Sequence, residues 1–252
     1  MPTLSVVVIT RNEEANLARC LKSIAFADEI IVVDSHSTDR TPEVAAEFGA
    51  RFFKIDWTGF GAAKQSGVDR AKGDWILSLD ADEELTPELA GAIRRVVASD
   101  GPSDGYYLGR ITRFMGRWIE HSGWYPEFVL RLFKKDRGRL DGAVVHEKII
   151  LDGSSGRLDG DLKHYSYDNL GQYFEKFNRY TSLSAEQMHR RGREAGLYDI
   201  TMRPLASFFK HYAVGQGFLD GLEGLVLSLL SAAAVLVKYA KLIEMNRARD
   251  RR

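Results

Sequence analysis

The chain has 252 residues, of which 44% are hydrophobic, and its 35 lysines and arginines balance 35 aspartates and glutamates. This length and composition suit one large globular domain, alone or with an appendage. A net charge of zero argues against a general nucleic-acid binder, which carries a basic excess over a whole face. The single cysteine, Cys20, cannot form an internal disulfide. The N-terminal stretch MPTLSVVVIT lacks the basic flank and apolar length of a signal peptide, so we expect a cytoplasmic protein.

Short apolar runs rich in valine and isoleucine alternate with helical patterns in the first part of the chain. The runs are LSVVVI (4–9), EIIVVD (29–34), ARFFKI (50–55) and DWILSL (74–79). Near-continuous apolar segments of this length are typical of strands that are buried on both faces of a parallel sheet. The dipeptides Thr41-Pro42 and Thr86-Pro87 predict helix starts, because each places a capping residue before a proline. The alternation predicts an α/β fold with a doubly wound, mostly parallel sheet.

Acidic residues follow each predicted strand. The strands run in turn into Thr10–Glu13, Asp34–Asp39, Asp56 and Asp80-Ala81-Asp82. Ligands of open α/β sheets bind at the carboxyl ends of the strands, although aspartate is also common in turns. Carboxylates gathered at this edge would repel a bare phosphate, so they either hold a divalent cation or bind sugar hydroxyls and base edges. Asp80 and Asp82 flank one small residue, a spacing that suits a cation bridging to a diphosphate.

Two phosphate-binding motifs are absent from the sequence. No G-x-G-x-x-G follows the first predicted strand, and no G-x-x-x-x-G-K-[ST] occurs anywhere. The sequence therefore supports neither a dinucleotide-binding fold nor a P-loop nucleotide hydrolase.

Three segments resemble, in order, the signatures of family 2 glycosyltransferases. These segments are VVVITRNEEANLARCLKSI, EIIVVDSHSTDRT and AKGDWILSLDADEEL. The resemblance implies an inverting enzyme of the GT-A fold that uses a nucleotide sugar. Further along, YPEFVLRLFKK, GAVVHEKI and LKHYSY resemble a bacterial subgroup that includes the lipopolysaccharide core β-glucosyltransferases, which add a sugar to an inner-core heptose.

The resemblance also implies which residues bind the donor. It assigns the nucleoside pocket to Thr10, Asn12, Glu13 and Asp34, with Asp34 on the uracil or ribose. The common family pattern Asp-Asp-Gly-Ser is replaced here by Asp34-Ser35-His36-Ser37, which leaves the identity of the base open. Lys64 matches a position where the family often has a basic residue near the diphosphate, and the alternative is a solvated lysine on a helix surface.

A carboxylate and a metal complete the expected machinery. Inversion by direct displacement needs a base for the acceptor hydroxyl and a cation for the departing diphosphate. By resemblance Glu147 is the favoured base and Glu127 the alternative. A Mg²⁺ or Mn²⁺ ion is expected on Asp80, Asp82 and a downstream histidine. That histidine is His164, or His146 in its place, and a structural role for His164 is equally open.

The sequence changes character from about Asn169, so we expect a catalytic domain at 1–168 and a helical extension at 169–252. The last helical pattern has no charge between Glu223 and Lys238, a span shorter than the roughly 17–25 apolar residues of an ordinary transmembrane helix. We therefore expect a core or interfacial helix. Its basic end suits an anionic membrane surface, and a solvated tail is the alternative. The basic residues are Lys238, Lys241, Arg247, Arg249, Arg251 and Arg252.

Taken with the resemblance, these features predict a metal-dependent, inverting glycosyltransferase. It is expected to move a hexose, with glucose favoured, from a UDP-sugar to a lipid-linked saccharide such as lipopolysaccharide inner core, on the inner face of the cell membrane and without nucleic acid. One alternative is a non-catalytic carbohydrate-binding or membrane-scaffold protein. Another is a sugar-phosphate nucleotidyltransferase, which would show a glycine-rich loop after the first strand, whereas TRNEEAN has no glycine.

Overall fold

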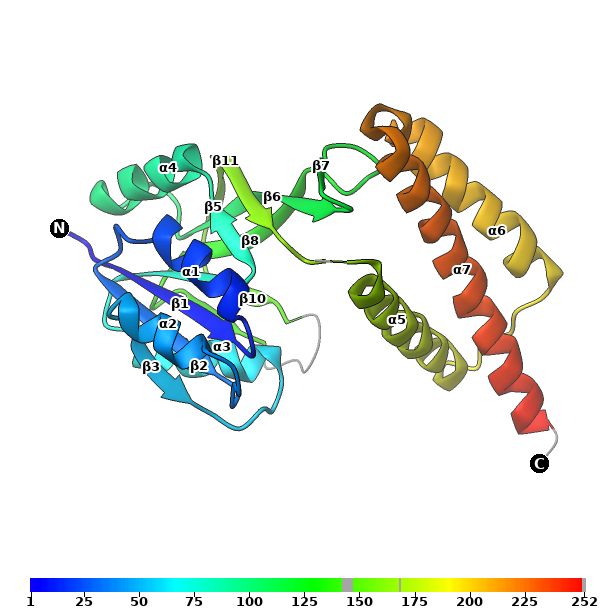
Figure 1. Cartoon of the computed structure of the whole chain (residues 1–252), viewed down its shortest axis with the longest axis horizontal. Coiled ribbons are helices and arrows are strands. Elements are labelled where there is room, and N and C mark those ends of the chain that lie inside the picture. Colours follow the sequence, from blue (N-terminus) through cyan, green and yellow to red (C-terminus); the bar gives the residue numbers. More distant parts are fainter. Residues whose placement is uncertain (142–146, 168, 251–252) are drawn as a thin grey trace. The chain divides into compact units, whose positions relative to one another are not determined.

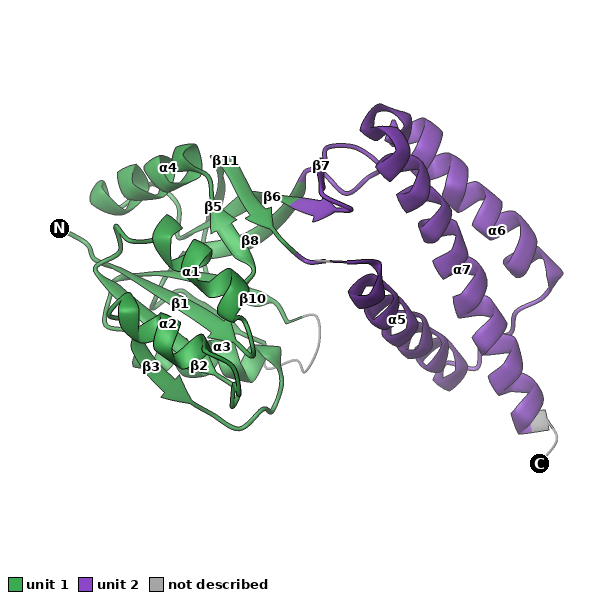
Figure 2. Cartoon of the chain, in the orientation of Figure 1, with its two compact units in different colours: residues 1–111, 127–165 green, residues 112–126, 166–252 purple. Residues whose placement is uncertain are grey.

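The structure is a computed structural model that describes residues 1–141, 147–167 and 169–250 (Figure 1). Its contacts divide these residues into two compact units, coloured separately in Figure 2. The first unit comprises residues 1–111 and 127–165, and the second comprises 112–126 and the chain from 166 onward. The functional division at 168/169 remains a prediction, but by contacts residues 112–126 group with the C-terminal helices.

The first unit contains the predicted parallel strands. They are β1 (Leu4–Thr10), β2 (Glu29–Asp34), β3 (Arg51–Lys54) and β4 (Trp75–Asp80), in the spatial order β3-β2-β1-β4. Every residue of β1 is buried, as expected for a strand covered on both faces. The connecting helices are α1 (Glu14–Ser23), α2 (Thr41–Glu47), α3 (Phe60–Arg70) and α4 (Pro87–Ala98). The predicted α/β fold with parallel strands is confirmed.

An antiparallel part extends this sheet beyond β4, so the sheet as a whole is mixed. Strand β8 (Glu127–Lys134) pairs antiparallel with β4 and with β6 (Gly105–Phe114), and β11 (Ser155–His164) pairs antiparallel with β5 (Glu83–Leu85). The order continues β4-β8-β6-β11-β5. The remaining strands are β7 (Arg117–Ile119), which pairs with β6, and the ribbon of β9 (Gly138–Leu140) and β10 (Ile149–Leu151).

Helices cover both faces of the sheet. Alternate residues of β1 point to opposite faces, so they pack against different helices. Val6 and Val8 pack with residues of α1 and α4 in one hydrophobic cluster. Val7 packs with residues of α3 in another. Helix α3 approaches the sheet closely at Gly67, where an added Cβ would overlap Val7 Cγ1. The residue type at this position therefore sets the distance between helix and sheet.

The second unit is mainly helical. It contains α5 (Leu170–Arg190), α6 (Leu197–Phe209), two short helical turns at Lys210–Val214 and Gly217–Asp220, and α7 (Gly221–Asp250). Helix α7 packs against both α5 and α6. One small core joins Phe114 and Ile119 to Tyr173 and Leu227. Residues 112–126 therefore bury apolar side chains against the helices, which explains their place in this unit.

Helix α7 corrects one expectation. The segment 217–249 is long and apolar enough to cross a membrane by length and composition alone, so the expectation that its uncharged span is too short does not hold on that criterion. Only 22% of its most apolar stretch is buried within the structure. The helix is therefore not enclosed as a core helix would be.

We predict that Gly67→Ala destabilises the protein by about 1–3 kcal/mol, because a methyl group here forces α3 away from Val7 and Val33. Urea unfolding measures the change in free energy. Gly91→Ala in α4 is the matched control, since its Cβ would meet only Arg95 Nη1, at 3.5 Å. The control should gain about 1 kcal/mol or less from the better helix former. Equal losses in the two variants would contradict the close approach of α3.

Candidate active site

The strand register gathers the predicted donor-binding residues at one edge of the sheet. Strand β1 lies between β2 and β4, with Thr10 opposite Asp34 on one side and Ile9 opposite Asp80 on the other. All three strands are parallel, so their carboxyl ends meet at this edge. The nucleoside candidates and the Asp80-Ala81-Asp82 segment are therefore neighbours, as the sequence predicted.

The nucleoside candidates tie the first two strand-to-helix loops together. Asp34 is fully buried, and its carboxylate accepts hydrogen bonds from the backbone N–H of Ser37, at 2.9 Å, and from its hydroxyl. The Asn12 N–H donates to Ser37 Oγ at 2.8 Å, and Asn12 Oδ1 accepts from the Thr38 N–H at 2.8 Å. Asn12 has a positive φ of 55°, a conformation that asparagine tolerates better than most residues. These bonds give the edge a fixed shape.

Thr10 and Glu13 occupy different positions in the first loop. Thr10 ends β1, and among the described residues its buried hydroxyl has no hydrogen-bond partner. An unsatisfied buried hydroxyl is unfavourable unless a ligand or water bonds to it. Glu13 precedes α1, and its carboxylate accepts a hydrogen bond from Asn16 Nδ2 at 2.8 Å. The structure thus places Thr10 at the edge and Glu13 against its own helix.

The carboxylates that follow β4 have different partners. Asp80 Oδ1 lies 2.8 Å from Lys64 Nζ, and Asp80 Oδ2 lies 2.7 Å from Arg131 Nη2. Glu83 Oε1 accepts hydrogen bonds from Arg131 at 2.7 Å and Arg110 at 3.2 Å. Burial alone would raise the pKa of the Asp80 carboxyl, but the Lys64 and Arg131 cations hold it well below its usual range. Asp80 is therefore ionised at neutral pH.

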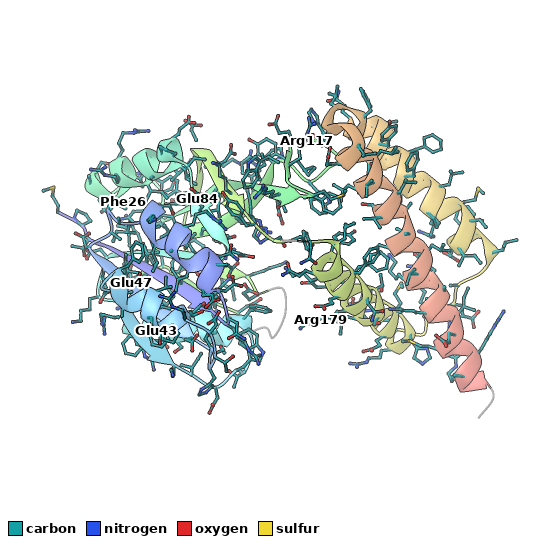
Figure 3. All side chains as sticks on the ribbon, in the orientation of Figure 1. Phe26, Glu43, Glu47, Glu84, Arg117 and Arg179 are labelled. Carbon is teal, nitrogen blue, oxygen red and sulfur yellow. The ribbon has the colours of Figure 1, made fainter. Side chains whose placement is uncertain are left out.

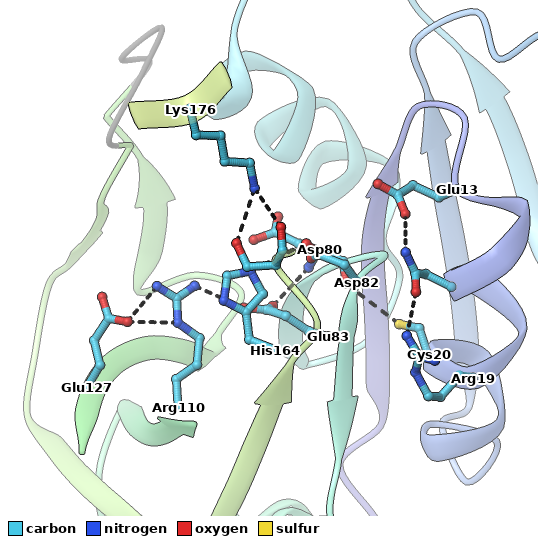
Figure 4. A network of polar contacts seen from close by, with 12 residues as sticks. Glu13, Arg19, Cys20, Asp80, Asp82, Glu83, Arg110, Glu127, His164 and Lys176 are labelled. Atoms are coloured by element: carbon cyan, nitrogen blue, oxygen red, sulfur yellow. Dashed lines mark hydrogen bonds and ion pairs between the residues drawn. The ribbon is translucent and has the colours of Figure 1, made fainter. Parts of the chain in front are cut away.

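Two outer members complete this set of carboxylates. Arg110 extends the ion pairs to Glu127, whose carboxylate lies 2.7 Å from Arg110 Nη2 (Figure 4). Glu84, which is labelled in Figure 3, accepts a hydrogen bond from the Tyr165 hydroxyl at 2.6 Å. The segment after β4 thus sends its side chains to several elements and fixes them to one another.

Lys64 is the residue whose environment differs most from a surface position. Its side chain is 1% exposed, and its ammonium lies 2.6 Å from Glu147 Oε1 as well as 2.8 Å from Asp80. It is therefore not the solvated helix lysine that the sequence left open. The Lys64 side chain thus links the favoured base, Glu147, directly to Asp80. The competing base, Glu127, is linked to Asp80 less directly, through Arg110 and Glu83.

Asp82 and His164 form the second pair of predicted residues that the structure brings together. Strand β11 runs antiparallel to β5, with His164 opposite Glu83, and His164 Nε2 lies 3.4 Å from Asp82 Oδ2. A carboxylate and an imidazole are suitable ligands for Mn²⁺. Within residues 1–141, 147–167 and 169–250, no group of three or more acidic, histidine or cysteine side chains is arranged to hold a metal. Asp80 pairs with Lys64 and Arg131, so its role as a metal ligand stays a prediction, and His146 lies outside the described residues.

The sequence analysis missed Arg131 and Arg110, the cations that organise the site. One signal was present: Arg131 interrupts the otherwise apolar strand FVLRLF, and a charged residue in a buried strand is seldom found without a partner. The pairing of β8 with β4 is not visible in the sequence, so Asp80 and Glu83 could not be named as its partners.

Comparisons with known proteins identify the family of this chain. A family model described as glycosyl transferase family 2 matches residues 5–150. An uncharacterized glycosyltransferase of Rickettsia felis is 31% identical and covers 97% of this chain and 90% of its own length. The lipopolysaccharide core biosynthesis glycosyltransferase LpsC of Rhizobium meliloti is 29% identical over 94% of this chain and 93% of its own.

Solved structures were compared as well. TarS of S. aureus, crystallised with UDP-GlcNAc, aligns with 98% of this chain and 92% of its own at 16% identity and a TM-score of 0.49. Glucosyl-3-phosphoglycerate synthase of Mycobacterium tuberculosis, crystallised with Mn²⁺ and UDP, aligns with 44% of each chain at 27% identity and a TM-score of 0.36. Because the family model matches more than half of the sequence, this chain belongs to glycosyltransferase family 2.

Proposed function

We propose that the protein is a metal-dependent, inverting hexosyltransferase that moves a hexose, with glucose favoured, from a UDP-sugar to a lipid-linked saccharide. The observation that carries this proposal is the buried Lys64 ammonium between Asp80 and Glu147. It joins the diphosphate side of the expected donor site to a carboxylate that can act as a base. Lys64 therefore contacts both the proposed donor side of the site and the proposed base for the acceptor.

The donor nucleoside is proposed to bind at the edge formed by β1 and β2. The buried Asp34 carboxylate and the unsatisfied Thr10 hydroxyl supply an acceptor and a hydroxyl group at neighbouring positions. Uracil and ribose offer N–H and O–H groups that suit these partners. The diphosphate would then extend toward Lys64, whose ammonium is attracted to phosphate oxygens.

Glu147 is proposed as the base that takes the proton of the acceptor hydroxyl. Its side chain is 16% exposed, against 50% for Glu127, so it is better shielded from bulk water while still accessible. Lys64 holds the Glu147 carboxylate in place by its hydrogen bond. A donor diphosphate would share the Lys64 ammonium with Glu147, so the base is oriented in the same step that positions the sugar.

A Mg²⁺ or Mn²⁺ ion is proposed to bind at Asp82 and His164. Their oxygen and nitrogen atoms lie 3.4 Å apart and suit such an ion, whose other ligands would come from water and the donor. When bound, the ion stabilises the negative charge of the departing diphosphate. Asp80 is proposed to contact the donor rather than the metal. Its ion pairs with Lys64 and Arg131 keep its carboxylate ionised and in place.

The acceptor and location are proposed from a relative and from the C-terminal helices. LpsC, which is similar over nearly the whole chain, acts in lipopolysaccharide core biosynthesis, which supports a lipopolysaccharide inner-core acceptor. A UDP-sugar is cytoplasmic, so the enzyme is proposed to work as a peripheral protein on the inner face of the cell membrane. A non-catalytic role does not explain why Lys64 is buried between two carboxylates. A buried ion pair adds little to stability, so stability alone does not account for this arrangement.

We predict that Asp82→Asn abolishes transfer while the protein stays folded, because a neutral amide is a much weaker ligand for a divalent cation. Transfer of glucose from UDP-glucose to lipopolysaccharide from a strain that lacks this protein is the assay. Asp136→Asn, which removes one exposed carboxylate elsewhere, is the control and should keep the wild-type rate. Full activity of Asp82→Asn, or of wild type in excess chelator, would exclude metal dependence.

Replacing each of the two candidate bases by glutamine distinguishes their roles. Glu147→Gln should lower kcat by about 10² or more, because general-base catalysis contributes that much, while the affinity for UDP-glucose stays nearly unchanged. Glu127→Gln, which leaves Lys64 and its two carboxylates intact, should have the smaller effect. A larger loss of kcat in Glu127→Gln than in Glu147→Gln would reverse the assignment.

A further inference from the structure

Helix α6 exposes an apolar stripe. Tyr198, Met202, Leu205 and Phe209 recur at intervals of three and four residues, which places them on one face of the helix. These four side chains, here called the α6 stripe, are between 47% and 64% exposed, and no residue of α6 is fully buried. Side chains project from α6 away from α7 in Figure 3. The helix therefore presents apolar groups outward.

The apolar exposure continues through the turns that lead into α7. Val214, Phe218, Leu219 and Leu222 are each at least 50% exposed. Soluble monomeric proteins seldom expose neighbouring large apolar side chains in this number, and such patches mark contact sites for a partner or a membrane. This part of the second unit thus has an uncovered apolar surface that the folding of the chain does not explain.

Three cations lie around the ring of Tyr239 in α7, and one of them, Arg203, adjoins the α6 stripe at Tyr198, 5.7 Å from that ring centroid. The charged groups of Arg193, Arg203 and Lys238 are 5.6, 5.5 and 5.0 Å from the ring centroid. Arg203 follows Met202 directly, and it has an ion pair with Asp199 at 2.7 Å. Among the described residues, no carboxylate forms an ion pair with Arg193 or Lys238. This group, here called the Tyr239 cations, carries more positive charge than its own acids neutralise.

The environment of Lys238 indicates that the group is electrostatically incomplete. Burial, and then repulsion from Arg193 and Arg203, lowers the pKa of its ammonium. An anion placed among the three cations would relieve this repulsion. A phosphate group fits this need, because arginine binds phosphate oxygens in a bidentate manner and lysine binds them as a point charge.

We propose that the α6 stripe and the Tyr239 cations form one docking surface for a bilayer that contains anionic lipid. The stripe would lie among the upper parts of the acyl chains, and the cations would contact headgroup phosphates. Charge complementarity favours this occupant over a second copy of this chain docked through the same surface, which would bring more cations and no anion to the Tyr239 cations. Tyr198 also suits the boundary between lipid and water, where aromatic side chains are enriched.

The surface lies on the membrane rather than across it. Lys238 ends the uncharged span of α7, so a spanning α7 would bring this charge, with Arg193 and Arg203 packed about its neighbour Tyr239, to the margin of the hydrocarbon, where charged residues are unfavourable. The interfacial orientation keeps all three in the headgroup region. This proposal rests on the proposed function, since a lipid-linked acceptor is confined to such a surface, but its test needs neither donor nor acceptor.

Flotation with vesicles tests the proposal on the full-length protein. Wild type should bind vesicles of phosphatidylcholine with phosphatidylglycerol more tightly than vesicles of phosphatidylcholine alone. Met202→Gln and Leu205→Gln should each weaken binding to the anionic vesicles about tenfold, because each removes an apolar side chain from the lipid. Arg203→Gln and Lys238→Gln should each weaken it about fivefold and reduce the preference for phosphatidylglycerol.

Matched controls separate docking from general effects. Ile150→Gln removes a similarly exposed apolar side chain from the first unit, and Arg40→Gln and Arg137→Gln each remove one exposed charge there. All three should bind as wild type, and thermal unfolding should show that every variant is folded. Lys238→Gln and Arg203→Gln report on the cations independently, should one of them lose stability.

Three outcomes would overturn the proposal. The first is wild-type binding by folded stripe and cation variants. The second is a loss that appears only when Arg247, Arg249, Arg251 and Arg252 are replaced by glutamine, which would assign docking to the C-terminal tail, of which Arg251 and Arg252 lie outside the described residues. The third is a concentration-dependent dimer that Leu205→Gln dissociates, since the stripe would then be covered by a second copy. None of these results depends on whether the chain transfers glucose.

Discussion

An alternating series of ion pairs at the carboxyl edge of the sheet is the interaction on which the candidate site depends. It runs from Glu147 through Lys64 to Asp80, and from Asp80 through Arg131 to Glu83. Its members come from four stretches of the chain, since Asp80 and Glu83 share one, so a displacement of one element would leave a buried charge without its partner. An unpaired buried charge costs several kcal/mol, whereas an intact pair contributes little. The series therefore specifies geometry more than it adds stability.

This constraint explains why the antiparallel strands matter for function. Strand β8 carries Arg131 and pairs with β4, which ends at Asp80, so the register of two strands brings the cation to the carboxylate. Strand β11 returns along β5 and ends at His164, next to Asp82. The parallel half of the sheet supplies the edge proposed to bind the donor, and the antiparallel half supplies the groups that fix its carboxylates. A site assembled this way is organised before any ligand binds, which reduces the reorganisation required during reaction.

The parallel half of the fold could be predicted from the sequence, because a strand such as 4–9, covered on both faces, is a nearly unbroken apolar run. The edge carrying Asp34 and Asp80 followed from the same reasoning. The antiparallel strands could not be placed, since their pairing depends on contacts between distant residues and not on local pattern. The partners of Asp80 were missed for that reason, as was the burial of Lys64, for which the sequence left a solvated position on a helix surface open. The placement of Phe114 and Ile119 with the helices depends on packing against Tyr173 and Leu227, which no local signal reveals.

The two units differ in how fully their cations are paired with carboxylates, and we relate this difference to the ligand proposed for each unit. In the first unit the buried cations are matched by carboxylates, so the proposed donor would have to enter an existing network of ion pairs. In the second unit, cations such as Lys238 lie beside exposed apolar side chains and are only partly neutralised. Such a surface gains little from a soluble metabolite, which cannot cover its apolar part. A lamellar partner that offers acyl chains and phosphates together satisfies both components at once.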